Sequence, residues 1–390
     1  MTIGIDKIGF ATSQYVLKLQ DLAEARGVDP EKFSKGLLLN EISIAPLTED
    51  IVTLAASASN SILTDKEKEE IDMVIVATES GIDQSKAAAV FVHGLLGIQP
   101  FARSFEIKEA CYGATAALHY AKLHVENSPE SKVLVIASDI AKYGVGTPGE
   151  PTQGAGSVAM LITQNPRIMA FNNDNVAQTR DIMDFWRPNY SSTPYVNGMY
   201  STQQYLDCLT TTWDEYKKRY DWTMGDFAAI CFHLPYPKLA LKGLRKMMDK
   251  TLSKEKQDSL QENFDKSILY SQMIGNIYTG SLFLGLLSLL ENAETLKAGD
   301  KIALYSYGSG AVSEFFSGEL VEGYEVYLDK DRLSKLKQRT ALSVTDYEKV
   351  FFEEVQLDES GSAQFAGYEH QDYALVEIID HQRRYSKVEK

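Results

Sequence analysis

One short stretch decides the fold: Glu109-Ala110-Cys111-Tyr112-Gly113-Ala114-Thr115-Ala116-Ala117-Leu118. From Ala114 to Val125, apolar residues recur at steps of three and four, which predicts a helix buried on one face. Cys111 would lie at or just before its first turn, where free backbone N–H groups and the helix dipole favour a thiolate. A buried structural cysteine is the commoner fate of this residue type. The stretch by itself favours neither interpretation.

The composition of the chain sets limits on its class. It has 390 residues, enough for two domains, with an ordinary 44% hydrophobic and 24% charged residues. The formal charge of −15 argues against a nucleic-acid partner, because phosphates must be neutralised by basic groups. The three cysteines lack the spacing of a disulfide framework or a zinc site, so we expect a reducing compartment and no metal. The sequence opens on no secretory signal and holds no apolar stretch of about 20 residues, which predicts a cytoplasmic protein without membrane contact.

Segments in the two halves of the chain repeat in the same order. The pairs are Cys111-Tyr112-Gly113-Ala114-Thr115 with Asn276-Ile277-Tyr278-Thr279-Gly280, Lys132-Val133-Leu134-Val135-Ile136 with Lys301-Ile302-Ala303-Leu304-Tyr305, Gly154-Ala155-Gly156-Ser157-Val158 with Gly308-Ser309-Gly310-Ala311-Val312, and the strand before Glu79 with the strand before His233. A single strand–helix–strand likeness would mean little, because many folds alternate these elements. Four matched segments in one order predict an α/β unit that is used twice.

The hydrophobic pattern predicts the individual elements. We expect strands at residues 3–11, 71–77, 132–138, 154–163, 227–232 and 301–307 and helices at 31–38, 50–63, 202–220, 238–249 and 277–290. Residues 172–222 are crowded with Tyr, Trp, Asn and Thr and are expected to cross between the halves with one helix. Beyond about residue 321 the chain is charged, and we expect irregular structure until a last strand at 375–379.

The repeat has a consequence for chemistry. Packing the two copies about a pseudo-twofold axis would place Cys111 opposite Asn276, with Glu79 and His233 in equivalent places around them. A nucleophile, two titratable groups and an amide donor are the minimum set for acyl transfer. The glycine-rich turn at 308–310 offers backbone N–H groups to a developing oxyanion. Each member also has a plainer interpretation, as a solvated carboxylate, a buried histidine or a helix cap, so only the set argues for an active site.

Five motifs together resemble those of the hydroxymethylglutaryl-CoA synthase family, within the thiolase superfamily. They are Ala110-Cys111-Tyr112-Gly113, Thr78-Glu79-Ser80-Gly81-Ile82-Asp83, Phe232-His233-Leu234-Pro235-Tyr236, Gly275-Asn276-Ile277-Tyr278-Thr279 and Ser306-Tyr307-Gly308-Ser309-Gly310. The resemblance implies a thiolase-like duplicated α/β fold in five layers ordered αβαβα. It implies an N-terminal half at residues 1–170 with Glu79 and Cys111, a C-terminal half at 171–390 with His233 and Asn276, and a homodimer.

The reaction implied by this resemblance is a Claisen-type condensation. Acetyl-CoA, acetoacetyl-CoA and water would give 3-hydroxy-3-methylglutaryl-CoA and CoA, in the mevalonate route to isoprenoid precursors. Cys111 would carry acetyl as a thioester, and Glu79 would remove a proton from its methyl group and later protonate the new alkoxide. His233 would hold the acetoacetyl oxygen, Asn276 would orient the acetoacetyl group, and the Ser309 backbone N–H would serve the oxyanion.

The same resemblance implies where the substrates bind. The helix after His233 would lie along CoA, and Lys238 and Lys242, one turn apart, would share the face toward its phosphates. The other members of the implied binding set are Asp29, Thr152 and Ser201. CoA thioesters would be substrates, and no further cofactor is expected. Pro148 departs from the pattern of animal members, which have Asn there, so the wall near residues 144–151 is left open.

Other functions remain as alternatives. A ketoacyl-carrier-protein synthase of the kind that starts fatty-acid chains also uses Cys, His and Asn at these places, but it has no carboxylate base at the position of Glu79. A degradative thiolase would need a second catalytic cysteine in the C-terminal half, and no cysteine follows Cys231. A non-catalytic scaffold of the same fold would have no reason to keep Cys111, Glu79, His233 and Asn276 together.

Overall fold

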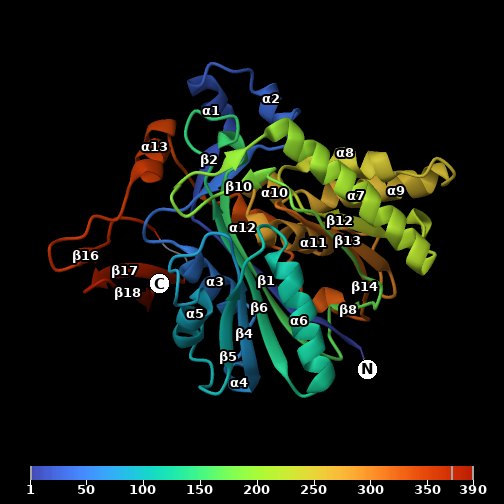
Figure 1. Ribbon diagram of the computed structural model, residues 1–390, viewed down its shortest axis with the longest axis horizontal. Helices are drawn as coiled ribbons and strands as arrows, with labels where there is room; N and C mark the ends of the chain where they lie inside the picture. Colours follow the sequence, from blue (N-terminus) through green and yellow to red (C-terminus); the bar gives the residue numbers. More distant parts are fainter. Residues whose placement is uncertain (1, 370–371, 389–390) are drawn as a thin grey trace.

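The structure, a computed structural model, describes residues 2–369 and 372–388. Within these residues the main element is a ten-stranded sheet in the order β12-β13-β14-β8-β1-β7-β6-β4-β5, with β9 paired to β14 (Figure 1). Its strands are β1 (Ile3–Thr12), β4 (Ile71–Ala77), β5 (Arg103–Ile107), β6 (Lys132–Ala141), β7 (Gly154–Gln164), β8 (Met169–Phe171), β9 (Val176–Thr179), β12 (Ala229–Phe232), β13 (Lys301–Gly308) and β14 (Val312–Leu320).

Three small sheets and the helices surround it. The small sheets contain β2 (Tyr15–Lys18), β3 (Glu41–Ile44) and β15 (Thr340–Ala341); β10 (Phe185–Trp186) and β11 (Tyr195–Val196); and β16 (Ala363–Gln364), β17 (Tyr373–Ile379) and β18 (Gln382–Lys387). The helices are α1 (Leu19–Ala25), α2 (Glu31–Ser34), α3 (Ile51–Asn60), α4 (Asp65–Glu70), α5 (Ala88–Leu96), α6 (Gly113–Asn127), α7 (Gly198–Tyr220), α8 (Pro237–Met247), α9 (Lys254–Ser267), α10 (Ser271–Ile274), α11 (Ser281–Asn292), α12 (Arg332–Leu336) and α13 (Val344–Phe352). Short 3-10 turns are η1 (Glu150–Thr152), η2 (Met224–Asp226), η3 (Tyr278–Gly280) and η4 (Tyr324–Tyr327).

The two halves of the large sheet repeat one pairing pattern, which confirms the predicted duplication. β4 is parallel to β6, and β6 is antiparallel to β7. In the same way, β12 is parallel to β13, and β13 is antiparallel to β14. The next strand in each half is again antiparallel: β1 to β7, and β8 to β14. β8 pairs with both β1 and β14 and so joins the halves, and the predicted boundary between residues 170 and 171 falls within it.

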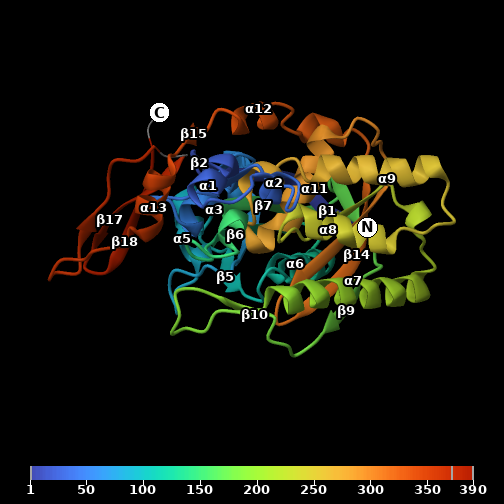
Figure 2. The same ribbon diagram turned by 90° about the horizontal axis from the view of Figure 1, so that it is seen from above.

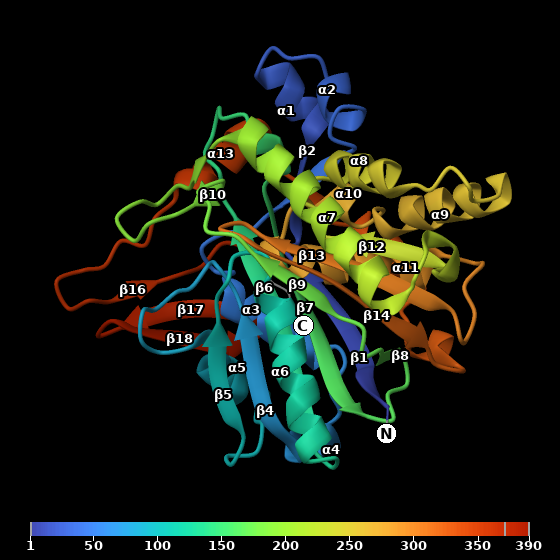
Figure 3. The same ribbon diagram turned by 45° about the vertical axis from the view of Figure 1, so that its right-hand side comes forward.

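Alternating side chains on the strands produce the predicted layers. On β4, Met73 and Ile75 pack in the central core with α6 and α11, whereas Val74 and Val76 face the outer core with α3 and α5. On β13, Leu304 lies in the central core, and its neighbours pack outward with α7 and α8. Helices therefore cover both outer faces, and α6 and α11 form the middle layer. Figure 3 shows α6 lying along β4 and β6. The predicted buried face of the Cys111 helix is confirmed: Ala114, Ala117, Leu118, Ala121 and Val125 are all buried.

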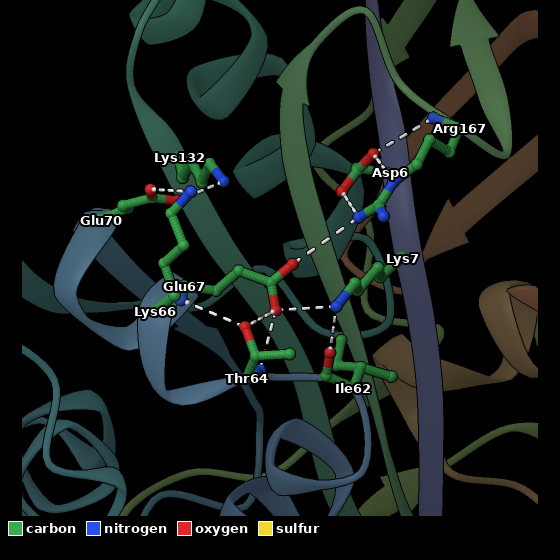
Figure 4. Close-up of polar contacts among 9 residues, drawn as sticks. All are labelled: Asp6, Lys7, Ile62, Thr64, Lys66, Glu67, Glu70, Lys132 and Arg167. Carbon is green, nitrogen blue, oxygen red and sulfur yellow. Dashed lines mark hydrogen bonds and ion pairs between the residues drawn. The ribbon is translucent and has the colours of Figure 1, made fainter.

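A polar cluster joins β1 to the start of α4 (Figure 4). Glu67 on α4 accepts hydrogen bonds from Lys7 Nζ at 2.7 Å and from the backbone and side chain of Thr64, both at 2.8 Å. Arg167 pairs with Asp6 at 2.5 Å and reaches Glu67 at 3.6 Å. Burial acts to raise the pKa of Glu67, but the bonds from Lys7 and Thr64 outweigh it and hold that pKa below its ordinary value. The cluster thus ties β1, α4 and the β7–β8 connection together.

Several predicted elements differ from the observed ones. The helix expected at 31–38 ends at Ser34, and Leu38 has a φ of +60° that no helix contains. α7 begins at Gly198 rather than at residue 202, because the Asn197 side chain accepts the Tyr200 N–H and caps it. α9 was not predicted. Gly154 opens β7 whereas Gly308 ends β13, so the alignment of these two glycine segments is wrong.

The region beyond residue 321 is not irregular, which corrects that prediction. It forms η4, α12, β15, α13 and a three-stranded sheet whose β17 contains the expected last strand (Figure 2). β15 is two residues long and is held by parallel pairing with β2, near the other end of the chain. α13 buries only Tyr347 and Val350. Such short elements depend on distant partners, so local periodicity does not reveal them.

Candidate active site

The site forms where the chain leaves β4 and enters α6. Glu79 lies two residues after β4 and Cys111 two residues before α6. The Cys111 Sγ–H donates to Glu79 Oε1 at 3.2 Å, so the predicted nucleophile and carboxylate are in contact. The residue before the cysteine, Ala110, has a φ of +38°, a conformation that is strained for any residue except glycine. The turn thus holds the thiol against the carboxyl group.

The thiol is not activated by the helix in the way that the sequence suggested. The Ala114 N–H, in the first turn of α6, donates to Thr279 Oγ1 at 2.7 Å and is therefore not free. Burial raises the pKa of Cys111 well above its ordinary value, and the negative charge of Glu79 raises it further. The predicted low-pKa thiolate is wrong for the unliganded site, where the cysteine is a thiol that must pass its proton to a base.

Asp139 holds the turn that presents Glu79. Its Oδ1 accepts the Glu79 N–H and the Thr78 hydroxyl, both at 2.9 Å, and the Ser80 hydroxyl at 2.7 Å. Its Oδ2 accepts the Thr279 N–H at 3.3 Å, which brings in the second half of the chain. Burial raises the pKa of Glu79 above its ordinary value, and the charge of Asp139 raises it further. A carboxyl group poised in this way is suited to both take and return a proton near neutral pH.

Asp139 was missed by the sequence reasoning. It is fully buried inside the predicted strand at 132–138 and its continuation. A buried aspartate in an apolar strand is itself the signal that could have found it, because such a group must have several donors around it.

His233 is fixed directly after β12. It is 2% exposed, its N–H donates to Tyr305 O at 2.8 Å, and its carbonyl accepts the Tyr205 hydroxyl at 2.9 Å. Burial lowers the pKa of His233 to about 3, so the ring is neutral. Its Nδ1 is buried and has no hydrogen-bond partner among the residues that the structure describes. A buried ring nitrogen without a partner is typical of a group that acts on a ligand.

The strand register brings His233 to the same end of the molecule as Cys111. β12 and β13 are parallel neighbours, so His233 follows beside Ser306. The Thr115 hydroxyl, one turn along α6 from Cys111, donates to Ser306 Oγ at 2.8 Å. The two halves of the chain therefore meet at this point, as the duplication predicted.

Asn276 is held by three hydrogen bonds of its side chain. Nδ2 donates to the Tyr143 hydroxyl at 2.8 Å, and Oδ1 accepts the Tyr278 N–H at 2.9 Å and the Ser281 hydroxyl at 2.8 Å. Burial raises the pKa of Tyr143, and the charges of Cys111 and Glu79 raise it further, so this tyrosine lies near both groups. Tyr143 was missed because it stands in a Gly- and Pro-rich loop with no local pattern.

Asp184, which is buried, is the third residue that the sequence reasoning missed. It accepts the Gly310 N–H at 2.9 Å, the Tyr307 hydroxyl at 2.8 Å and the Ser201 hydroxyl at 3.2 Å. It therefore fixes the turn that carries Ser309. A Cβ on Gly308 would come within 2.7 Å of Glu109 O and of Tyr112, so this turn packs directly on the Cys111 segment.

Comparison with known proteins assigns the chain to a family. The model of the N-terminal part of hydroxymethylglutaryl-CoA synthase matches residues 2–167, and that of the C-terminal part matches residues 175–262 and 245–385.

The chain belongs to the hydroxymethylglutaryl-CoA synthase family.

Its similarity to individual relatives extends over nearly the whole chain. It is 54% identical to a hydroxymethylglutaryl-CoA synthase of Enterococcus faecalis, over 92% of this chain and 94% of that one. A crystal structure of HMG-CoA synthase complexed with CoA superposes with a TM-score of 0.98 at 68% identity and covers both chains completely. A structure in complex with 3-hydroxy-3-methylglutaryl coenzyme A gives a TM-score of 0.88 at 32% identity, over 99% of each chain. The predicted family and thiolase-like fold are thus confirmed.

The remaining residues suggested by the resemblance lie farther out. Lys238, half-buried, and Lys242, exposed, stand on α8, and the described residues provide no ion pair to either. The Lys238 N–H donates to Leu37 O at 3.0 Å, which joins α8 to the segment that begins at Asp29. Asp29 is exposed and accepts the Glu31 N–H at 2.9 Å. The Thr152 carbonyl accepts the Asn276 N–H at 3.1 Å.

No group of three or more His, Cys, Asp or Glu side chains in residues 2–369 and 372–388 is arranged to hold a metal ion. No helix in that part of the chain is both long enough and apolar enough to cross a membrane.

The raised thiol pKa gives a test in solution. Because alkylation needs the thiolate, the rate at which iodoacetamide modifies Cys111 should rise about tenfold per pH unit from pH 6 to pH 9, without a plateau. Cys208 and Cys231 are buried, and a Cys111→Ala variant measures their background. A rate that levels off at or below pH 7 would contradict the raised pKa.

Proposed function

We propose that this chain condenses acetyl-CoA with acetoacetyl-CoA and water to give 3-hydroxy-3-methylglutaryl-CoA and CoA. The observation that supports this most directly is the 3.2 Å contact between Cys111 Sγ and Glu79 Oε1, two half-buried side chains. Acyl transfer needs the thiol alone, whereas carbon–carbon bond formation also needs a base beside the carbon next to the thioester carbonyl. A carboxylate that touches the sulfur stands within reach of the methyl group of an acetyl bound there.

The first step is acetylation of Cys111. The sulfur attacks the thioester carbonyl of acetyl-CoA, and the thiol proton passes to Glu79, which accepts it in the structure. The carbonyl oxygen gains negative charge and is stabilised by the Ser309 N–H in the turn that Asp184 fixes. The intermediate collapses, the C–S bond to CoA breaks, and Glu79 returns its proton to the departing thiolate. Acetyl-Cys111 and CoA result, and Glu79 is ionised again.

The second step is the condensation. Glu79 removes a proton from the methyl group of acetyl-Cys111, and the resulting enolate attacks the ketone carbon of acetoacetyl-CoA. Glu79 then gives this proton to the new alkoxide. The neutral imidazole of His233 donates a hydrogen bond to the acetoacetyl oxygen. Asn276 donates one of its two Nδ2 hydrogens to the Tyr143 hydroxyl, so the other is available to orient the substrate.

Water completes the cycle. It attacks the thioester that links the product to Cys111, the C–S bond breaks, and 3-hydroxy-3-methylglutaryl-CoA leaves as the free acid while the thiol regains a proton. The overall reaction is redox-neutral, so it needs no oxidant or reductant. We further propose that Lys238 and Lys242 bind the phosphates of CoA, since they face solvent side by side. Asp29, Thr152 and Ser201 are proposed as substrate-binding residues on the family resemblance.

The alternative condensing enzyme is less well supported. A ketoacyl-carrier-protein synthase generates its carbanion by decarboxylation and needs no base at the position of Glu79. Here Glu79 is buried, its backbone is fixed by Asp139, and its pKa is raised by burial and by that neighbour. Keeping a carboxyl group in such a place is costly in free energy, which argues that it takes part in the reaction.

The proposal includes a homodimer in the cytoplasm. β5 ends the large sheet and pairs only with β4 among the described strands, so its outer edge is unpaired. Phe101, 90% exposed, precedes β5, and the exposed Tyr120 and Leu123 lie on α6 beside it. An open edge flanked by apolar side chains suits antiparallel pairing with a second copy. Three cysteines that are all free thiols suit a reducing compartment.

The role of Glu79 can be separated from that of Cys111 by substitution. Glu79→Gln should still become acetylated by acetyl-CoA, as seen by the mass of the protein, but more slowly, because the relay of the thiol proton to the departing CoA is lost. It should form the condensation product at least about a thousandfold more slowly, because no base remains beside the methyl group. Cys111→Ala should show neither acetylation nor product. Condensation by Glu79→Gln at the wild-type rate would remove Glu79 from the mechanism.

The dimer is tested by mass in solution. Light scattering after size-exclusion chromatography should give twice the chain mass of 43.5 kDa for the wild-type protein. Combining Phe101→Asp with Leu123→Glu should give the monomer mass, because charges would be buried in the proposed contact. A wild-type protein that remains monomeric at tens of micromolar would contradict this part of the proposal.

A further inference from the structure

The loop of residues 143–153 forms one wall of the site and contacts Asn276 from two directions. The Tyr143 hydroxyl accepts from Asn276 Nδ2, and the Thr152 carbonyl accepts the Asn276 N–H. Gly144 and Gly146 have φ values of +101° and +72°, a region that glycine enters without strain. The conformation that places Asn276 therefore depends on a side chain that anchors the loop to other elements.

Glu150 is that anchor. Its carboxylate is 2% exposed and lies within the loop in η1. Arg26 approaches it with two donors, Nε to Oε2 at 3.0 Å and Nη2 to Oε1 at 2.8 Å. The Gly146 N–H donates to Oε2 at 2.9 Å, and the Tyr347 hydroxyl donates to Oε1 at 3.2 Å. A buried carboxylate with a two-pronged arginine partner is strongly directional, so it fixes position as well as charge.

The contacts continue from this anchor to the site. Gln153 Nε2 donates to the Tyr347 hydroxyl at 2.9 Å. Gln153 Oε1 in turn accepts the N–H groups of Tyr143 and Gly144, at 2.8 and 3.3 Å. Tyr347 belongs to α13, in the C-terminal region of the chain. An unbroken path of hydrogen bonds thus runs from α1 and α13 through the loop to the amide of Asn276.

We propose that Glu150 is a positioning residue for the acetoacetyl-CoA side of the site. This rests on the proposed function. Held by Arg26 and Tyr347, Glu150 keeps the loop in the one shape that aims the free Nδ2 hydrogen of Asn276 at the substrate. It does not act on acetylation, because Cys111 and Glu79 are fixed by Asp139, Thr279 and α6, none of which touches the loop anchor.

The test is a steady-state comparison with Glu150→Gln, which keeps the size of the side chain and removes its charge. The KM for acetoacetyl-CoA should rise roughly tenfold or more, since a displaced Asn276 amide would bind the correctly oriented substrate less tightly. The rate at which acetyl-CoA acetylates the protein should stay within about twofold of wild type. A general loss of structure would slow acetylation as well as condensation, so an unchanged acetylation rate beside a raised KM distinguishes positioning from stability.

Two further variants complete the experiment. Glu348→Gln is the matched control: Glu348 pairs with the same Arg26 at 2.7 Å but is 36% exposed and lies off the path, so its kinetics should equal those of wild type. Tyr347→Phe removes the link from Glu150 to Gln153 and should raise the KM for acetoacetyl-CoA in the same direction. If Glu150→Gln does not fold, Tyr347→Phe decides the question.

The outcomes separate this inference from the proposed function. A wild-type protein that forms no product from the two thioesters overturns the proposed function and this inference with it. A wild-type protein that condenses, together with Glu150→Gln or Tyr347→Phe at the wild-type KM for acetoacetyl-CoA, overturns only the inference. Parallel loss of acetylation and condensation in Glu150→Gln also overturns it, because the residue would then act on the whole fold.

Discussion

The active site depends on holding the Glu79 carboxyl group against the Cys111 thiol, partly shielded from water. Glu79 and Cys111 are neighbours only because a turn after β4 and a turn before α6 meet, and each turn is held from outside. Burial raises the pKa of both groups; the charge of Glu79 raises that of Cys111 further, whereas the hydrogen bond from Cys111 lowers that of Glu79. The site therefore favours the protonated thiol beside its base. Protons can then move between two atoms that are already in contact.

The duplicated fold supplies the supports that this arrangement needs. Thr279, from the second half, bonds both to the first turn of the cysteine helix and to Asp139 beneath Glu79. Thr115 and Ser306 join the same helix to the strand beside His233. Removing any one of these partners from the folded chain would leave its buried mate unpaired, which costs about 1–3 kcal/mol for each group. The halves therefore form the site jointly, and neither could hold its geometry alone.

Local sequence patterns predicted the parts of the molecule that are specified locally. The strand at Ile71–Ala77 and the buried face of the cysteine helix follow from periodicity, and the repeat of these patterns predicted the duplicated sheet. Asp139, Asp184 and Tyr143 could not be assigned in this way, because their importance lies in partners far along the chain. The thiol pKa was predicted in the wrong direction since its cause, burial beside Glu79, is a tertiary effect. α13 was missed for the same reason: its Tyr347 has its partners in the loop of residues 143–153.

The central claim is that the carboxyl group beside Cys111 takes a proton from carbon. The most direct measurement uses acetyl-CoA with a fully deuterated methyl group and no second substrate, with mass spectrometry of the acetylated peptide over time. In water, the wild-type acetyl-enzyme should lose deuterium to solvent, because Glu79 removes and returns methyl hydrogens. The same acetyl group on a protein with Gln at position 79 should keep all of its deuterium. Equal loss from both proteins, or none from the wild type, would contradict the account.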